Sequence, residues 1–397
     1  MNPVKNRKII PVRLLAATLQ AKVPVEVVGD QATLPRGPCG KEKGPDLRYG
    51  PYLESVNQML VKDDYQKLFK ALYSRLNRVV AAEEIDCLEI KTEKHGAFYH
   101  VARVDISISG QKIPFAVNVA ASPEGREQLE RDFRLLEMLT RRYRYRILPD
   151  VYFKGAGLYR EKGKSTKWLH MFVAEWLGGY HEFHLHRDDA GGSNLMLLWD
   201  SDMGLRYMSQ EECLDLYRQA ARILTLYYDY HNCRQIYPWH HAAGDFVLKI
   251  DKGKVDVRLI TARDYGAVGD FVSRKKEAKL LGLITFFLYL TIQMRVDRLD
   301  GVGQVVWAED YCLEGTVAGF FSGWAQARKG SKKATPSAGE LRDLFSRFSR
   351  DEWLEFLVEV VGNYAFSQEE SFLLRSQGDA HISRLKELLT SPTIFLE

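Results

Sequence analysis

Apolar and polar residues alternate along the chain between residues 87 and 121, and turn residues divide this pattern into three stretches. The stretches read CLEIKTEKHG, AFYHVARVDISIS and KIPFAVNVAAS. Alternation rich in β-branched residues is typical of strands with one buried face, so we expect three antiparallel strands. A helix is expected before them, over roughly 52–80, because Leu60, Leu68 and Leu72 recur at helical spacing. Residues 1 to about 50 read as irregular.

A helix and two more strands follow these three. Ser122 and Pro123 are typical of a helix start, with serine as the N-cap and proline in the first helical position. The sequence after this helix, ILPDVYFKGAGLYREKGKSTKWLHMFVAEWLGG, contains two apolar runs separated by a polar turn. The order strand, strand, strand, helix, strand, strand predicts a small α+β lobe.

The second half of the chain is predicted to be mainly helical. SQEE (209–212) and SRDE (349–352) are capping boxes that open helices. FVLKI-DKGK-VDVRLI predicts a hairpin with Gly253 in its turn. The run LLGLITFFLYLTIQM (280–294) is too short to cross a bilayer, so we expect a helix buried in a protein core.

The order of these elements, together with several short motifs, resembles the protein-kinase-like superfamily, which includes protein kinases and aminoglycoside phosphotransferases. MFVAEWLGG (171–179) is similar to the hinge that binds adenine, FAVNVA (115–120) to the third strand, and DYG (264–266) to the metal-binding motif. The resemblance implies an α+β, two-lobed protein-kinase-like fold, with a small five-stranded antiparallel N-lobe carrying one helix and a mainly helical C-lobe. The expected divisions are an extension (1–84), the N-lobe (85–178), and the C-lobe with a C-terminal helical extension (179–397).

In the expected N-lobe, the resemblance assigns the nucleotide contacts. The backbones of Glu175 and Leu177 would contact the adenine edges, with Ala174 in front of the back pocket. Gly96 is the single glycine left where the family has a glycine-rich phosphate loop. A plain β-hairpin is the alternative there.

The lysine that would meet the phosphates is replaced by Asn118, which carries no charge. Its partner on the helix would be Asp132, with Glu130 and Glu127 as register alternatives. All three acids could instead be surface residues of an amphipathic helix.

The catalytic loop would lie in WHHAAGDFVLKI (239–250), where two registers are open. In the first, His241 takes the place of the catalytic aspartate and Phe246 that of the metal-binding asparagine. In the second, Asp245 is the base, and Ile250 stands where asparagine is expected. Asp245 is in either case the acid expected to have kept chemistry, and Asp264 would hold Mg²⁺, with Asp245 as a second ligand. His240 or His241 could act as a base or could be packed structure.

Composition narrows the classes of partner. The net charge of +4 argues against a dedicated nucleic-acid surface, and the basic cluster RRYRYR (141–146) reads as a helix end, with RNA binding as the alternative. Five scattered cysteines without a CxxC pair indicate reduced thiols in a cytoplasmic protein. The start of the chain lacks the apolar run of a signal peptide, and no transmembrane segment is expected. The histidines of YHEFHLHRDD (180–189) indicate a solvated loop, with zinc as the alternative.

Three functions are compatible with this sequence. The first is a pseudokinase or nucleotide-binding regulatory scaffold, because the lysine, aspartate and asparagine positions are all substituted. The second is a divergent phosphotransferase that uses ATP and Mg²⁺ on a small molecule, a glycolipid or a protein. The third is a helical interaction protein without a nucleotide site, in which Phe320, Phe321 and Trp324 would bind a partner or, alternatively, pack the tail onto the rest of the chain.

Overall fold

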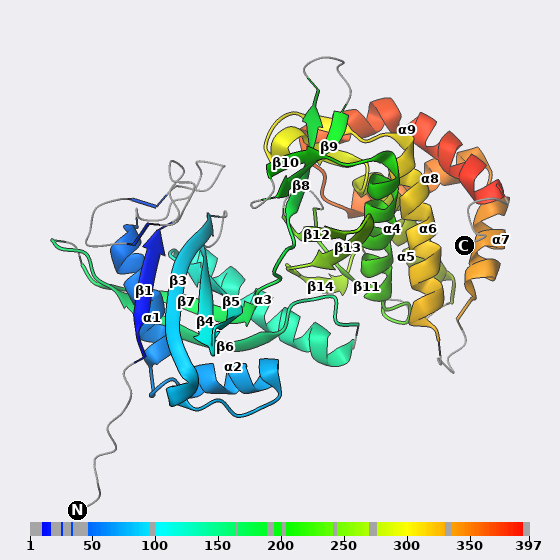
Figure 1. Cartoon of the computed structure of the whole chain (residues 1–397). Coiled ribbons are helices and arrows are strands. Elements are labelled where there is room, and N and C mark those ends of the chain that lie inside the picture. Colours follow the sequence, from blue (N-terminus) through cyan, green and yellow to red (C-terminus); the bar gives the residue numbers. More distant parts are fainter. Residues whose placement is uncertain are drawn as a thin grey trace, which may run out of the picture. The chain divides into compact units, whose positions relative to one another are not determined.

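The chain forms two compact units, and each is described separately below (Figure 1). The first unit contains Met1–Arg142 and Pro149–Gly178, and the second contains Tyr143–Leu148 and Gly179–Glu397. In this computed structural model, the residues described are 10–16, 25–26, 33–34, 47–95, 100–143, 145–163, 165–188, 194–200, 204–240, 244–269, 276–329 and 335–391.

The first unit is built on a mixed sheet in which seven strands pair in the order β2-β1-β3-β4-β5-β7-β6. β1 runs parallel to β3, and every other neighbouring pair is antiparallel. The strands are β1 (Val12–Ala16), β2 (Val25–Glu26), β3 (Ile85–His95), β4 (His100–Ile108), β5 (Gln111–Ala120), β6 (Val151–Tyr159) and β7 (Lys167–Glu175). The three strands expected from the alternating pattern are confirmed as β3, β4 and β5.

The predicted five-stranded antiparallel N-lobe with one helix is wrong. Two further strands, β1 and β2, extend the sheet beyond β3, and the parallel pairing of β1 makes the sheet mixed. The unit also contains three α-helices within its described residues: α1 (Tyr49–Val61), α2 (Gln66–Leu76) and α3 (Pro123–Arg142). β1 was missed because VRLLA lies in a stretch that read as irregular, and five residues with an arginine among them are too few to show a period.

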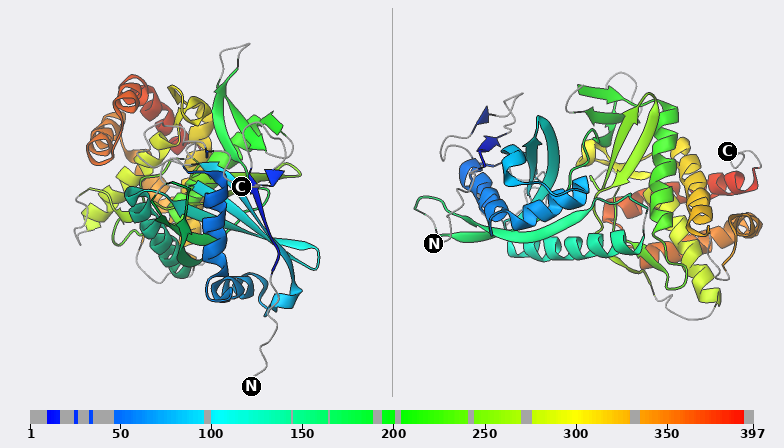
Figure 2. Two further views of the ribbon diagram at one scale, coloured as in Figure 1. Left: turned by 90° about the vertical axis from the view of Figure 1, so that its left-hand side faces the viewer. Right: turned by 60° about the horizontal axis from the view of Figure 1, so that its bottom comes forward.

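The helices α1 and α2 cover one face of this sheet, and α3 lies on the other (Figure 2). On the first face, Tyr52, Leu53 and Val56 of α1 are fully buried in the same core as strand residues of β3, β4 and β5. α1 and β6 are so close that a Cβ at Gly157 of β6 would lie 1.7 Å from the carbonyl oxygen of Ser55 in α1. On the second face, Phe133 of α3 packs on Phe172 of β7, with ring centroids 5.7 Å apart.

The single helix expected over 52–80 is two helices instead. Asp63, Asp64 and Tyr65 have positive φ values of 54°, 55° and 61°, which end α1 and set the direction of α2. Aspartate tolerates the left-handed region better than most residues, since its short side chain can form local hydrogen bonds. The helical spacing of the leucines continues through this break, so the pattern alone hid it.

The second unit combines four small sheets with six α-helices in its described part. The sheets pair as β10-β9-β8, β11-β14, β12-β13 and β15-β16. The strands are β8 (Glu182–Arg187), β9 (Asn194–Asp200), β10 (Gly204–Tyr207), β11 (Arg234–Ile236), β12 (Phe246–Asp251), β13 (Lys254–Leu259), β14 (Tyr265–Ala267), β15 (Val296–Arg298) and β16 (Val305–Trp307). The helices are α4 (Gln210–Leu226), α5 (Lys276–Gln293), α6 (Asp310–Ala327), α7 (Ala338–Arg347), α8 (Arg350–Asn363) and α9 (Gln368–Thr390).

The local signals of this half are confirmed. The side chains of Ser209 and Ser349 accept hydrogen bonds from the N–H groups of Glu212 and Glu352, so both capping boxes open helices. The hairpin of β12 and β13 turns with Gly253 at a φ of +76°. β8 corrects one expectation, because the histidine-rich stretch is a strand rather than a loop.

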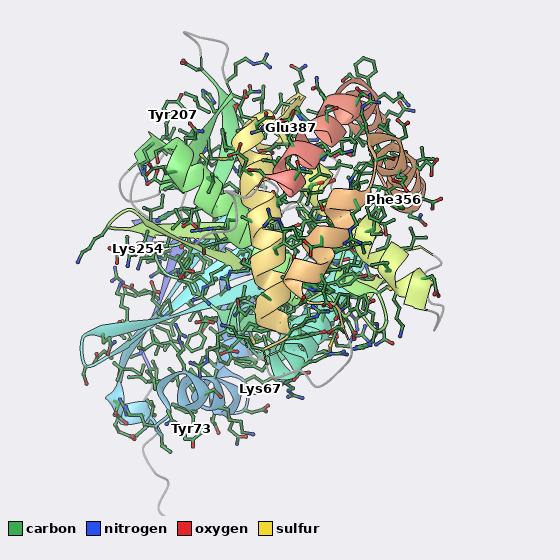
Figure 3. The ribbon with its side chains drawn as sticks, turned by 90° about the vertical axis from the view of Figure 1, so that its right-hand side faces the viewer. Lys67, Tyr73, Tyr207, Lys254, Phe356 and Glu387 are labelled. Atoms are coloured by element: carbon green, nitrogen blue, oxygen red, sulfur yellow. The ribbon has the colours of Figure 1, made fainter. Side chains whose placement is uncertain are left out.

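An aromatic cluster fills the centre of the helices in the second unit. Phe287 of α5 contacts the rings of Phe320, Phe345 and Trp353 at centroid distances of 4.5, 5.0 and 6.0 Å. Phe356, labelled in Figure 3, lies on α8 and packs edge to face on Trp353. Since Phe320, Phe321 and Trp324 are all buried, the packing alternative for these residues is confirmed. None of the helices within the described ranges is long and apolar enough to cross a membrane.

Candidate functional site

Asp245 lies immediately before β12 and accepts three hydrogen bonds. Its Oδ1 accepts a hydrogen bond from Nη2 of Arg263 at 2.6 Å, and its Oδ2 accepts the backbone N–H of His240 at 2.7 Å. Its carbonyl oxygen accepts the N–H of Ile260 at 2.8 Å. The carboxylate is only 3% exposed. Asp245 therefore joins the segment before β12 to the segment after β13, and an arginine already neutralises its charge.

Asp264 is exposed and stands at the start of β14. Its Oδ1 accepts the N–H of Tyr265 at 2.7 Å, and its carbonyl oxygen accepts the N–H of Tyr237 at 3.2 Å. Tyr265 is buried, and its hydroxyl lies 2.5 Å from that of Tyr143. The DYG motif is thus part of a strand, in which Gly266 pairs with Gln235 of β11.

No group of three or more histidine, cysteine, aspartate or glutamate side chains able to hold a metal ion occurs among the residues that the structure describes. Asp245 and Asp264 are the two acids that the sequence assigned to Mg²⁺. The guanidinium of Arg263, one residue before Asp264, bonds to Asp245. Mg²⁺ at Asp245 would compete with that guanidinium for the same oxygen, so the surroundings of Asp245 do not fit a cation.

The other residues of the expected catalytic loop are largely core. Trp239 is buried and packs on Phe246 and Tyr289 at centroid distances of 6.3 and 5.9 Å. Phe246 is fully buried at the start of β12, so Asp245 is the last polar residue before the strand. His241, the residue assigned to the catalytic position, lies outside the described residues.

In the first unit, Asn118 is half-buried on β5, on the face of the sheet that α3 covers. It pairs in register with Val101 of β4 and with Phe172 of β7. Its neighbours Val117 and Val119 are buried in the core beneath α1. Since successive residues of a strand point to opposite faces, the side chain of Asn118 points to the face that α3 covers. The strand therefore presents an uncharged amide where the resemblance implies a lysine.

Of the three acids considered on α3, Asp132 alone is buried. Its Oδ1 accepts a hydrogen bond from Nε2 of Gln128 at 2.6 Å, and Gln128 in turn accepts one from Arg131 at 2.8 Å. Glu130 instead pairs with Lys154 of β6, and Glu127 is exposed. Asp132 is thus fixed by neighbours on its own helix.

In the segment that resembles a hinge, one backbone N–H group is already hydrogen-bonded within the first unit. The N–H of Glu175 donates to the carbonyl oxygen of Asp150 at 2.7 Å, and its carboxylate pairs with Arg75 at 2.5 Å. Leu177 follows β7 and is half-buried. Gly96 lies outside the described residues, between the end of β3 and the start of β4.

Sequence reasoning missed a set of charged residues on β3, β4 and β5. Asp105 is buried and pairs with Arg103 at 2.7 Å and with Lys91 at 3.5 Å. On the same face, the hydrogen bond from Lys112 holds the pKa of Glu89 below its usual value in spite of partial burial. The signal was present in the sequence, because these charges occupy alternate positions of strands that are apolar on their other face.

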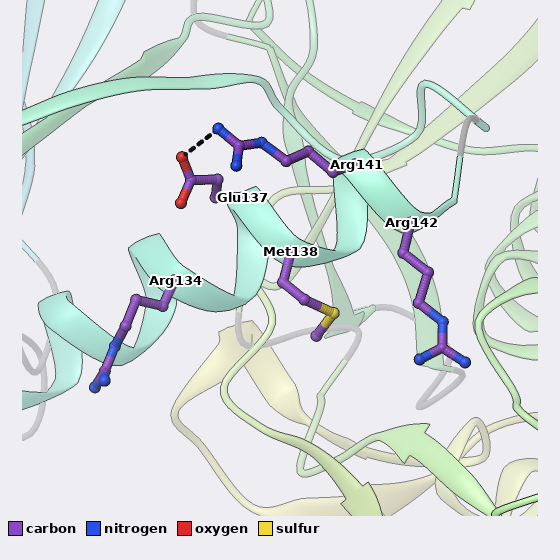
Figure 4. Close-up of a pocket in the computed structure, with 5 residues that line it drawn as sticks. All are labelled: Arg134, Glu137, Met138, Arg141 and Arg142. Carbon is purple, nitrogen blue, oxygen red and sulfur yellow. Dashed lines mark hydrogen bonds and ion pairs between the residues drawn. The ribbon is translucent and has the colours of Figure 1, made fainter.

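A shallow depression of about 450 Å³ lies on α3, lined by Arg134, Glu137, Met138, Arg141 and Arg142 (Figure 4). Arg141 pairs with Glu137 at 2.9 Å. Arg141 and Arg142 begin the basic cluster for which RNA binding was the alternative, and none of the residues assigned to catalysis, nucleotide or metal binding is among the lining residues. Arg141 and Arg142 form the last turn of α3, where arginines are favourable to the helix dipole.

No model of a known protein family matches the sequence, and no curated protein matches it either. The functional argument therefore rests on the residues and their geometry.

Proposed function

We propose that this protein is a pseudokinase-like binding or regulatory protein, in which residues at the positions of phosphotransfer groups have taken structural roles. The ion pair between Asp245 and Arg263 supports this proposal more than any other observation. A general base must reach the proton of an acceptor hydroxyl, whereas the carboxylate of Asp245 is buried and already accepts hydrogen bonds from a guanidinium and a backbone N–H.

Two features of the first unit support the same proposal. Phosphoryl transfer depends on positioned positive charge around the phosphates, and Asn118 supplies none. Asp132, its expected partner, is already bonded to Gln128. A residue pair that would orient a phosphate is therefore replaced by an amide and by an acid held within its helix.

A divergent phosphotransferase acting on a small molecule, a glycolipid or a protein is the second candidate. The exposure of Asp264 favours it, because a carboxylate at that position could bind Mg²⁺ and, through it, ATP. The partner of the protein is proposed to be a protein or a small molecule rather than a nucleic acid. A cytoplasmic location is proposed because the four described cysteines, Cys87, Cys213, Cys233 and Cys312, are not joined in disulfide bonds.

The test combines binding with turnover. Thermal shift with ATP, with and without Mg²⁺, would be measured beside release and transfer of labelled γ-phosphate. We expect no Mg²⁺-dependent phosphate transfer or release by the wild-type protein. Turnover that is lost in Asp264→Ala, but kept in the matched hairpin control Asp251→Asn, would contradict the proposal and favour the phosphotransferase.

A further inference from the structure

The end of the β6–β7 hairpin in the first unit is basic. The stretch REKGKST (160–166) joins the two strands, and Lys167 follows it as the first residue of β7. Together they contain four basic residues and one acidic residue. Arg160 and Lys162 are exposed, and neither forms an ion pair with another residue that the structure describes. Their charges therefore face the solvent without a partner from the unit itself.

The one acid of this stretch, Glu161, is turned inward and neutralised. Its side chain is only 3% exposed, and its Oε1 lies 3.1 Å from Nε of Arg48, the residue that precedes α1. Its Oε2 accepts a hydrogen bond from the hydroxyl of Tyr159 at 2.8 Å. Nζ of Lys167 lies 4.8 Å from the ring centroid of Tyr159. These contacts fix the hairpin end on the start of α1 and leave its outer surface positive.

A large apolar side chain stands beside these cations. Trp168 of β7 is 62% exposed, which makes it the most exposed of the seven tryptophans. It lies directly opposite Leu158 of β6, which is half-buried. The neighbouring residues Tyr159 and Leu169 are buried in the core beneath α1, so Trp168 and Leu158 lie on the other face of the hairpin. The hairpin continues past the start of α1 (Figure 1, Figure 2), so its end is accessible to a flat surface.

We infer that the end of the β6–β7 hairpin binds the surface of an anionic lipid bilayer, with Trp168 among the headgroups and the cations of residues 160–167 beside the lipid phosphates. Tryptophan prefers the boundary between water and hydrocarbon, because its ring is large and apolar while its N–H can still form a hydrogen bond. Basic residues around such a ring add electrostatic attraction to anionic lipids. This inference goes beyond the proposed function, since it uses none of the residues considered for phosphotransfer.

The form of this surface favours a bilayer over the other anionic partners. Proteins that bind single-stranded nucleic acid offer several rings on which successive bases stack. This hairpin end exposes only Trp168 among its described aromatic residues, since Tyr159 is buried. A stable complex with an acidic protein buries about 800 Å² on each partner and requires matching shapes. A fluid bilayer requires neither, because its lipids rearrange around one inserted ring. The cytoplasmic location proposed above is compatible, since anionic lipids are concentrated in the cytoplasmic leaflet.

The experiment is sedimentation of the full-length protein with vesicles of phosphatidylcholine, either alone or with about 30% phosphatidylserine. We expect binding to the anionic vesicles only, and weaker binding as the salt concentration rises. Trp168→Ala should lower the partition coefficient at least about tenfold, and so should Arg160→Glu combined with Lys162→Glu. Brominated lipids should quench the tryptophan fluorescence of the wild-type protein, and this quenching should be lost in Trp168→Ala.

Two matched controls lie in the second unit. Trp199→Ala removes another exposed tryptophan, which is 41% exposed on β9. Lys252→Glu combined with Lys254→Glu makes the same change of charge at the turn of the β12–β13 hairpin, which exposes no large apolar side chain among its described residues. Both control proteins are expected to bind the anionic vesicles as the wild type does.

Three results would overturn the inference. The first is a wild-type protein that does not sediment with anionic vesicles. The second is an equal loss of binding in the hairpin variants and in the controls, which would show that the overall charge acts rather than this hairpin. The third is binding of a uridylate RNA oligomer that is lost in Trp168→Ala while vesicles are not bound, which would assign the surface to nucleic acid. Urea unfolding checks that each variant is folded, and the two hairpin variants test the surface independently of each other.

Discussion

Gly319 of α6 faces the carbonyl oxygen of Arg218 of α4 so closely that a Cβ at Gly319 would lie 2.1 Å from that oxygen. Gly315 and Gly323 stand one turn to either side, and a Cβ there would lie 2.5 and 2.7 Å from the carbonyl oxygens of Leu214 and Arg222. The two helices are therefore in backbone contact along three successive turns.

Gly319→Ala is expected to destabilise the protein by about 1–3 kcal/mol, because the added methyl group must push the two backbones apart. The matched control is Gly362→Ala in α8, where a Cβ would meet nothing within 4 Å. That change should be neutral or stabilise by up to about 1 kcal/mol, since alanine favours a helix more than glycine does. Urea unfolding measures both, and equal effects would contradict the backbone contact.

Arg263→Met is expected to destabilise the protein by about 2–4 kcal/mol, because Asp245 would remain as a buried carboxylate without its cation. We expect a smaller loss of stability than for a fully buried ion pair, because the side chain of Arg263 is 35% exposed. Adding Asp245→Asn should recover part of the loss. A double-mutant cycle by urea unfolding checks this, and additive effects would show that the pair is not coupled.

His381 makes the stability of the second unit depend on pH. Burial, with a smaller contribution from Arg295, lowers the pKa of His381 to about 3. Below a pH of about 6.5 the unfolded chain takes up a proton that the folded protein does not, so stability falls as the pH falls from about 6.5 towards 3. The expected slope from this residue is about 1.4 kcal/mol per pH unit.

His381→Gln should flatten that slope. The glutamine can keep a hydrogen bond to Thr291, whose hydroxyl lies 3.1 Å from Nε2 of His381. Free energies of unfolding at several pH values between about 4 and 7 would be compared for the two proteins. An unchanged slope would contradict the assignment, even if the variant is less stable at every pH.

The parts of the fold that were predictable are those encoded locally. Alternation marks β3 to β5, and a serine followed three residues later by glutamate marks the start of α4 and α8, because both signals act within one strand or one helical turn. The pairing of β1 with β3 joins residues more than 70 positions apart. No local pattern records such a contact, so the mixed sheet could not be expected.

In the candidate site, too, the local features were predictable and the long-range contacts were not. The positions of Asp245 and Asp264 beside the hairpin followed from the sequence. Arg263 was missed because its bond to Asp245 crosses the whole hairpin, 18 positions away. The contact of Arg103 with Trp176 could not be predicted from the sequence, because it depends on strand pairings that place β4 and β7 on either side of β5.

The helices α1 and α2 seal one face of the seven-stranded sheet. The strand residues beneath these helices are buried, so they are out of reach of a ligand or a partner. Removing the segment before residue 85 would therefore expose a large apolar surface of the sheet to water. We expect such a shortened chain to aggregate rather than act as a smaller binding module.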